Sequence, residues 1–97
     1  MKVRYTARAR DDLSDILHYL DEHSRQGARN VKRAMDKAFS LIGRHPQIGR
    51  LSKVQETRVL PVGRYPYLIY WSIEAGEAWI VHIRHARRRP WADEIGE

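Results

Sequence analysis

The sequence predicts an α+β domain in which two helices pack on one face of an antiparallel sheet. Three observations predict it: polar and apolar residues alternate from Lys2 to Tyr5, apolar residues then recur with a helical period, and β-branched and aromatic runs follow Gly49. The expected order is strand, helix, helix, strand, strand, strand (β-α-α-β-β-β), and the last three strands are expected to form a three-stranded antiparallel sheet. We expect a single domain over residues 1–97, because compact domains commonly reach about 100 residues.

The first strand is expected to lead directly into a helix. Thr6 offers a hydroxyl that can cap the helix start. The apolar side chains that follow have i, i+3, i+4, i+7 spacing, which is one helix face: Leu13, Ile16, Leu17 and Leu20. Asp11, Asp12 and Asp15 come early in this helix, and we interpret them as exposed carboxylates that suit the positive end of the helix dipole.

A second helix is expected between Gly27, which permits a turn, and Gly43. Its apolar side chains share one face: Val31, Ala34, Met35, Ala38, Phe39 and Ile42. His45-Pro46 ends the helix, because proline disfavours the helical conformation of the residue before it. We therefore expect an antiparallel helical hairpin with a short connecting loop.

Three strands are expected after Gly49. Residues 57–62, 67–73 and 78–84 are rich in β-branched and aromatic side chains, and the Glu74-Ala75-Gly76-Glu77 segment between the last two predicts a hairpin turn. Tyr67 and Trp71 are expected to share one strand face. Since the helices cover only one face of the sheet, we expect the other to present aromatic side chains rimmed by arginine, a composition typical of binding interfaces.

The chain is basic, with 18 Lys and Arg against 12 Asp and Glu and a net charge of +6. The basic residues gather in residues 23–49 and again in the segment from Arg84 to Arg89. Arginine binds carboxylates and phosphates well, so acidic proteins or nucleic acid are the expected partners. For the basic face of the second helix, plain solvation is the more ordinary interpretation.

Composition also excludes several classes of protein. There is no cysteine, which excludes disulfides and thiolate metal sites. The charged opening residues predict no signal peptide, and no apolar run approaches the about 20 residues that a membrane span requires. We therefore expect a cytoplasmic protein without membrane contact.

The residues by themselves do not assemble an enzyme. A metal-free ribonuclease needs a base, an acid and cations around the phosphate. His82 and His85 are three positions apart on a predicted strand, so they point to opposite faces and cannot act as a pair. We interpret both as structural, and no metal, cofactor or catalytic residue is expected.

Four motifs occur in order along nearly the whole chain. They are Ala9-x-x-Asp12-Leu13-x-x-Ile16-x-x-Tyr19, then His45-Pro46-x-x-Gly49-Arg50, then Arg58-x-Leu60-x-Val62 with Arg64-Tyr65-Pro66-Tyr67-x-Ile69-Tyr70, and finally Ile83-x-His85-x-Arg87. In this order they resemble the RelE/ParE toxin superfamily of bacterial type II toxin–antitoxin systems. Tyr65-Pro66-Tyr67 resembles the ParE-like branch, because a RelE-like chain tends to carry arginine where Tyr67 stands.

The resemblance implies a toxin that inhibits DNA gyrase and is neutralised by a cognate antitoxin in a hetero-oligomer. The antitoxin is expected to be acidic, with a partly disordered C-terminal segment, and nucleic acid is expected to be reached only through it. Two alternatives stay open. One is a RelE-like, ribosome-dependent messenger RNA endoribonuclease that uses His85, Arg87 and Arg88. The other is a non-toxic family member that only binds the antitoxin.

Two sets of binding residues are predicted. The antitoxin is expected to bind the aromatic sheet face and its arginines, namely Arg58, Arg64, Tyr67, Trp71 and Arg84. The cellular target is expected to bind the C-terminal segment, because Arg and Trp often anchor interfaces. Its residues are Arg84, His85, Arg87, Arg88, Arg89 and Trp91.

Overall fold

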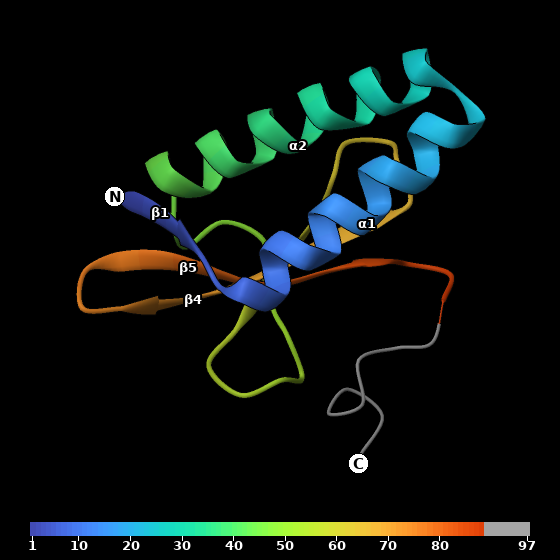
Figure 1. Cartoon of the computed structure of the whole chain (residues 1–97). Coiled ribbons are helices and arrows are strands. Elements are labelled where there is room, and N and C mark those ends of the chain that lie inside the picture. Colours follow the sequence, from blue (N-terminus) through green and yellow to red (C-terminus); the bar gives the residue numbers. More distant parts are fainter. Residues whose placement is uncertain (89–97) are drawn as a thin grey trace.

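The structure, a computed structural model, describes residues 1–88 (Figure 1). Its elements are β1 (Lys2–Tyr5), α1 (Ala7–His23), α2 (Arg25–Arg44), β2 (Arg50–Leu51), β3 (Arg58–Pro61), β4 (Tyr67–Glu74) and β5 (Glu77–His85). The strands form a five-stranded sheet in the order β1-β5-β4-β3-β2. Both helices lie on the same side of this sheet (Figure 1), which confirms the predicted layers.

The sheet is mixed, so the expected three-stranded antiparallel sheet is wrong in two respects. Strands β3, β4 and β5 pair antiparallel as predicted, but β1 joins the sheet and pairs parallel to β5, with Lys2 opposite Glu77 and Tyr5 opposite Ile80. At the other edge, β2 pairs antiparallel with β3. The parallel pairing joins segments far apart in sequence, and β2 is only 2 residues long, so neither leaves a local pattern.

The helices follow the predicted apolar stripes, but their connection is shorter than expected. Ser24 alone separates them: its N–H donates to the Leu20 carbonyl at 2.7 Å, and its hydroxyl accepts from the Gly27 N–H at 3.0 Å. Gly27 therefore lies in the first turn of α2 and does not form the turn between the helices. At the other end of α1, Thr6 Oγ1 accepts from the Ala9 N–H at 3.1 Å, which confirms Thr6 as the cap.

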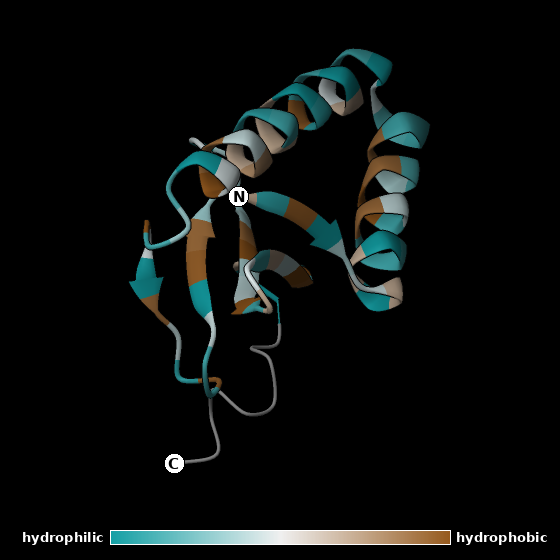
Figure 2. Cartoon of the chain, turned by 90° about the vertical axis from the view of Figure 1, so that its left-hand side faces the viewer, coloured by the Kyte–Doolittle hydropathy of each residue, from teal (hydrophilic) through white to brown (hydrophobic). Residues whose placement is uncertain are grey.

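The main core lies between the helices and the sheet. Met35 and Ile42 of α2 and Ile69, Trp71 and Ile80 of the sheet have no exposed surface. The side chains of Val31, Ala38 and Phe39 complete the buried face of α2 as the spacing predicted. The brown bands of Figure 2, which mark hydrophobic residues, face inward on both helices and alternate along the strands.

The second face of the sheet is covered around the middle of β4, so Tyr70 does not belong to an exposed aromatic face as predicted. Tyr70 and Val59, which pair across β4 and β3, are 0% and 1% exposed. The segment between β2 and β3 lies on the side of the sheet away from the helices (Figure 1). Val54 and Thr57 of this segment are buried, and the Thr57 hydroxyl donates to the Val54 carbonyl at 2.7 Å.

Trp71 holds the segment that follows α2 against the sheet. Its indole N–H donates to the Pro46 carbonyl at 3.0 Å, which fixes the chain after the helix. Gly49 then passes so close to the sheet, at φ 79°, that a Cβ there would lie 2.5 Å from the Val59 carbonyl oxygen and 3.0 Å from the Trp71 ring. Only glycine fits this backbone, so His45-Pro46-x-x-Gly49 is a packing motif.

Candidate functional site

A cleft of about 500 Å³ opens between α1 and the C-terminal half of β5. It forms here because β1 pairs only with residues 77–80 of β5, which leaves the rest of that strand edge to α1. The residues that line it come from α1, the start of β4, and the end of β5 with the turn after it. They are Asp12, Asp15, Ile16, Tyr19, Leu20, Tyr67, His82, Ile83, Arg84, His85 and Arg88.

Asp12 ties α1 to the open edge of β5. One carboxylate oxygen, Oδ2, accepts from the Ile83 backbone N–H at 3.0 Å and from His82 Nδ1 at 2.7 Å. Since a carboxylate can only accept, Nδ1 of His82 carries the proton. The expectation that Asp12 is an exposed helix-start carboxylate is wrong, because the first turn of α1 holds no acidic residue and Asp12 satisfies a strand edge.

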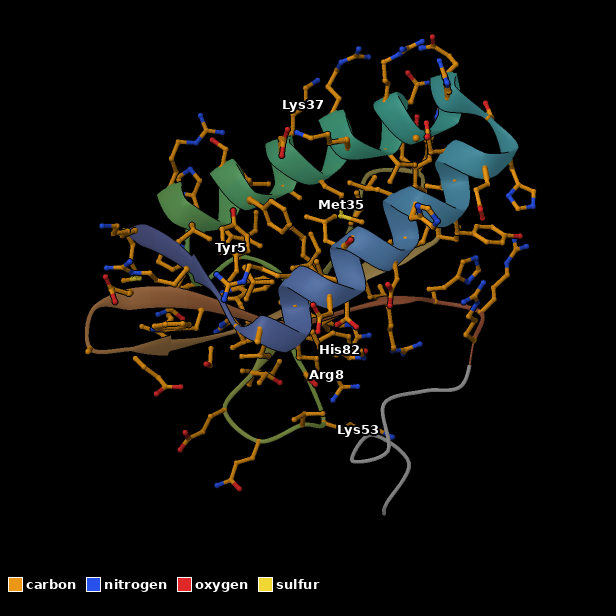
Figure 3. The ribbon with its side chains drawn as sticks, in the orientation of Figure 1. Tyr5, Arg8, Met35, Lys37, Lys53 and His82 are labelled. Atoms are coloured by element: carbon orange, nitrogen blue, oxygen red, sulfur yellow. The ribbon has the colours of Figure 1, made fainter. Side chains whose placement is uncertain are left out.

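His82 continues this contact into a polar network under the sheet. Its ring stacks on Tyr70 at 5.7 Å between centroids, and Arg84 Nε donates to the Tyr70 hydroxyl at 2.9 Å. Burial lowers the pKa of His82 below its ordinary value, with Arg8 and Arg84 acting in the same direction, while the Asp12 hydrogen bond and charge oppose this. Figure 3 shows His82 under α1 with Arg8 beside it. The imidazole is therefore neutral near neutral pH and holds the sheet to α1.

Arg84 has a structural role that its predicted binding roles did not include. Besides Nε, its Nη1 donates to the His85 carbonyl at 3.3 Å and the Ala86 carbonyl at 3.5 Å. The guanidinium also lies over the Tyr70 ring, 5.8 Å from its centroid. Arg84 thus fixes the chain where β5 ends and positions the residues that follow.

His85 begins the turn that closes the cleft. Its Nδ1 accepts from the Arg87 backbone N–H at 3.1 Å, and its carbonyl accepts from the Arg88 N–H, also at 3.1 Å. Its pKa is lowered by burial first and by the Arg88 and Arg87 charges second, so the ring is neutral near neutral pH. With Nδ1 an acceptor, the proton of the neutral ring is on Nε2, and the one basic lone pair, on Nδ1, is occupied by the Arg87 N–H.

An aromatic and cationic rim surrounds the mouth of the cleft. Tyr19 is 50% exposed, and the Arg88 guanidinium lies 5.9 Å from its ring centroid. Deeper in the cleft, the Tyr67 ring meets His85 edge-to-face at 5.4 Å. Burial raises the pKa of the Tyr67 phenol above its ordinary value, a rise that Arg88 opposes. Tyr67 is thus a protonated hydrogen-bonding group at neutral pH.

The residues predicted to bind the antitoxin do not form one surface. Tyr67 and Arg84 line the cleft, whereas Arg58 lies on β3, where its Nη1 reaches the Gly49 carbonyl at 3.5 Å. Arg64 lies over Tyr65 in the turn after β3, 5.9 Å from the ring centroid. The expectation that Trp71 is exposed on a sheet face is wrong, because it is wholly buried and its N–H is paired within the fold.

The residues predicted to bind the target are brought together, as far as the structure describes them. Arg84, His85 and Arg88 line the cleft and Arg87 is exposed beside them. His82 and His85 contact opposite faces of the sheet, as predicted, since His82 stacks on Tyr70 and His85 contacts Tyr67. Arg89 and Trp91 lie outside the described residues.

Sequence reasoning missed Asp12 and Tyr19 as members of the site. They are seven positions apart, with Ile16 between them, and all three line the cleft from one face of α1. That spacing was visible in Ala9-x-x-Asp12-Leu13-x-x-Ile16-x-x-Tyr19. The pairing of Asp12 with His82, 70 positions away, was not.

Residues 1–88 contain no group of three His, Cys, Asp or Glu side chains that could hold a metal ion. Within the same range, neither helix is long and apolar enough to cross a membrane.

Comparison with known proteins identifies the family. The family model described as the ParE toxin of the type II toxin–antitoxin system, parDE, matches residues 3–90. Toxin RelE2 of Caulobacter vibrioides is 33% identical over 89 residues, which cover 90% of this chain and 97% of that protein. The putative toxin Y4kP of Sinorhizobium fredii is 26% identical over 88 residues, covering 91% of each.

Among solved structures, one titled as the chromosomal ParDE TA system from P. aeruginosa superposes with a TM-score of 0.68 at 22% identity, covering 90% of this chain and 97% of that chain. At this identity the structural similarity shows a shared fold. Membership of the family is shown by the family model and by the Caulobacter relative. The chain belongs to the ParE toxin family and is the toxin of a type II toxin–antitoxin system.

Proposed function

We propose that the chain inhibits DNA gyrase through the end of β5 and the turn after it, and that an acidic antitoxin segment neutralises it by occupying the cleft. Gyrase inhibition is what resemblance to the ParE-like branch implies. The observation that carries the non-nucleolytic part of the proposal is the hydrogen bond from the Arg87 N–H to His85 Nδ1 at 3.1 Å. Because of this bond, His85, the histidine of the nuclease alternative, stabilises a turn.

The other groups in the cleft support binding and not cleavage. His82 and Tyr67 are each only 7% exposed, so neither group is readily accessible to a substrate phosphate. Arg88 supplies charge but no proton transfer, since a guanidinium stays protonated at neutral pH. A metal-free ribonuclease needs an accessible base, an accessible acid and cations together. Of these three, the described residues of the cleft supply the cations.

Neutralisation by occupation of the cleft follows from how the two predicted residue sets overlap. Tyr67 and Arg84, from the antitoxin set, line the same cleft as His85 and Arg88, from the target set. A segment bound there would cover the exposed ring of Tyr19 and pair its carboxylates with Arg88. One bound segment would then block the target surface without a conformational change. Because gyrase works on the chromosome, this proposal places the chain in the cytoplasm.

The proposal is tested in cells that express the chain without its antitoxin. Plasmid isolated after induction should lose negative supercoils, and messenger RNA should show no new internal ends. Co-expression of the antitoxin should restore both topology and growth. Codon-spaced cuts in ribosome-bound messenger RNA would replace this proposal with the RelE-like alternative. Stable antitoxin binding with no effect on growth would favour the non-toxic alternative.

A further inference from the structure

A row of basic side chains runs along the outside of α2. Arg25, Arg29, Arg33 and Lys37 follow one another at i, i+4 spacing, and all four are exposed. Residues at this spacing form a ridge on a helix surface. The outer side of α2 is coloured hydrophilic in Figure 2, and Lys37 points away from the sheet in Figure 3.

These charges are not used in ion pairs within residues 1–88. The ion pair on α2 there joins Lys32 to Asp36 at 3.1 Å, beside the row. Arg29 has a hydrogen bond to the neutral side chain of Gln26, at 3.5 Å. Four adjacent like charges repel one another by some tenths of a kcal/mol per i, i+4 pair, so they weaken the helix slightly when nothing binds them.

The turn after β3 places a fifth cation beside the row. Arg33 and Lys37 line a groove whose other wall is Arg64 and Tyr65, and no carboxylate lines this groove. On the other side of the row, Arg25 and Arg29 line a second groove with Lys32, where Asp21 is the one lining carboxylate. The surface is therefore positive across its width as well as along its length.

A polyanion fits this surface better than a protein. Protein interfaces depend on a few large apolar or aromatic anchors in a desolvated centre. The large hydrophobic side chains exposed on residues 1–88 are Met1, Tyr19, Leu51 and Ile73, and none lies on α2. A phosphate backbone requires charge and reach without such anchors.

The length and rigidity of the row favour a duplex. Successive members are about 6 Å apart along the helix axis, and the whole row spans about 18 Å. Measured along the duplex axis, that length corresponds to about five phosphates of one strand of B-form DNA, which repeat about every 3.4 Å of that axis. The ridge is inclined to the helix axis but is held rigid by the helix, so it can meet the fixed phosphates of a duplex without the ordering that a flexible single strand would require.

We propose that Arg25, Arg29, Arg33 and Lys37, with Arg64 beside them, bind the phosphate backbone of duplex DNA directly and without sequence preference. This goes beyond the toxin's inhibitory contact, and it differs from the sequence-based expectation that nucleic acid is reached only through the antitoxin. The row is carried by α2, and none of its members lines the cleft. The toxin can therefore contact DNA while its target surface stays available.

The test measures binding of the purified chain to a fluorescent duplex of scrambled sequence, by anisotropy over a range of salt. Between about 50 and about 200 mM salt the wild-type affinity should fall roughly five-hundredfold, because each of five phosphate contacts steepens the fall of log K with log salt by about 0.9. The variant R25Q/R29Q/R33Q/K37Q should bind at least about tenfold more weakly, with a slope smaller by about 3.6. Glutamine keeps the helix, since its helix propensity is close to that of Arg and Lys.

A matched variant controls for net charge. K2Q/R10Q/R50Q/K53Q removes the same charge from exposed residues outside the row, and it should keep most of the wild-type affinity and slope. Equal losses in the two variants would overturn the proposal in favour of general charge. Single-stranded RNA bound as tightly as the duplex, or a polyglutamate peptide whose binding depends on the row to the same extent, would also overturn it.

Discussion

Asp12 on α1 accepts hydrogen bonds from both His82 and the backbone N–H of Ile83 through a single carboxylate oxygen. The residues are about 70 positions apart in sequence, so this oxygen joins the first helix to the last strand. It replaces the strand partner that β5 lacks beyond its pairing with β1. This contact therefore links α1 to β5 where both elements line the cleft.

Asp12→Ala should destabilise the fold by about 1–3 kcal/mol, because it leaves two part-buried N–H donors without an acceptor. Asp15→Ala is the matched control: Asp15 lines the same cleft from the same helix but is exposed, so its loss should change stability by no more than about 0.5 kcal/mol. Urea unfolding followed by circular dichroism measures both. Equal effects in the two variants would show that Asp12 does not support β5.

Stability should fall as pH drops below neutrality. The pKa of His82 and that of His85 are both lower in the folded chain than the ordinary value of 6.5, chiefly because of burial. The unfolded chain therefore binds more protons, so the stabilisation is present above the unfolded pKa and is lost as pH falls through it. The free energy of unfolding should decrease between about pH 7.5 and about pH 5.5.

The contribution of His82 to this pH dependence can be separated. His82→Gln removes one titrating group while keeping an N–H for Asp12, so its unfolding free energy should vary less with pH than that of the wild type. A variant curve parallel to the wild-type curve would show that His82 does not titrate differently in the folded chain.

Gly49→Ala should be among the most damaging small substitutions. The new Cβ would lie 2.5 Å from the Val59 carbonyl oxygen at a positive φ, so conformational strain and overpacking add to about 3 kcal/mol or more. Gly76→Ala has a similar φ of 74° but open space around it, and should cost about 1–2 kcal/mol. Thermal unfolding of both variants separates the contact from the backbone strain, and similar melting points would contradict the close approach to Val59.

Tyr19→Ala should weaken antitoxin binding without weakening the fold. Tyr19 is half exposed at the rim of the cleft under Arg88, the position of an aromatic anchor, so its loss should raise the antitoxin Kd at least about tenfold. Leu51→Ala removes an even more exposed apolar side chain from β2, outside the cleft, and should leave the Kd unchanged. Calorimetric titration with the antitoxin compares them; equal Kd values would move the antitoxin away from the cleft.

Local patterns predicted the elements well. The apolar stripe of α2 is the buried stripe of the structure, and Glu74-Ala75-Gly76-Glu77 forms the expected turn, with positive φ at Ala75 and Gly76. What could not be predicted depends on contacts between distant segments: β1 beside β5, Asp12 on His82, and the Pro46 carbonyl under Trp71.

The candidate site was predicted only in part for the same reason. The end of β5 is one short segment, so Arg84, His85, Arg87 and Arg88 could be grouped by their proximity in sequence. The α1 residues of the cleft could not be grouped in this way, because the local sequence pattern does not indicate which face of α1 contacts β5. The predicted antitoxin surface was wrong at Trp71 because strand alternation indicates which residues share a face but not whether that face is covered.

Inhibition of purified gyrase tests the central claim most directly. DNA supercoiling would be measured with increasing amounts of the wild-type chain, of R87A/R88A/R89A, and of K2A/R10A/K53A, which loses the same charge from exposed residues outside the cleft. The wild type and the charge control should inhibit equally, and the C-terminal variant should need at least about tenfold more protein, since arginine is enriched among the few interface residues that each contribute about 2 kcal/mol or more. A folded C-terminal variant that inhibits as well as the wild type, or a wild-type chain that does not inhibit gyrase, would contradict the account.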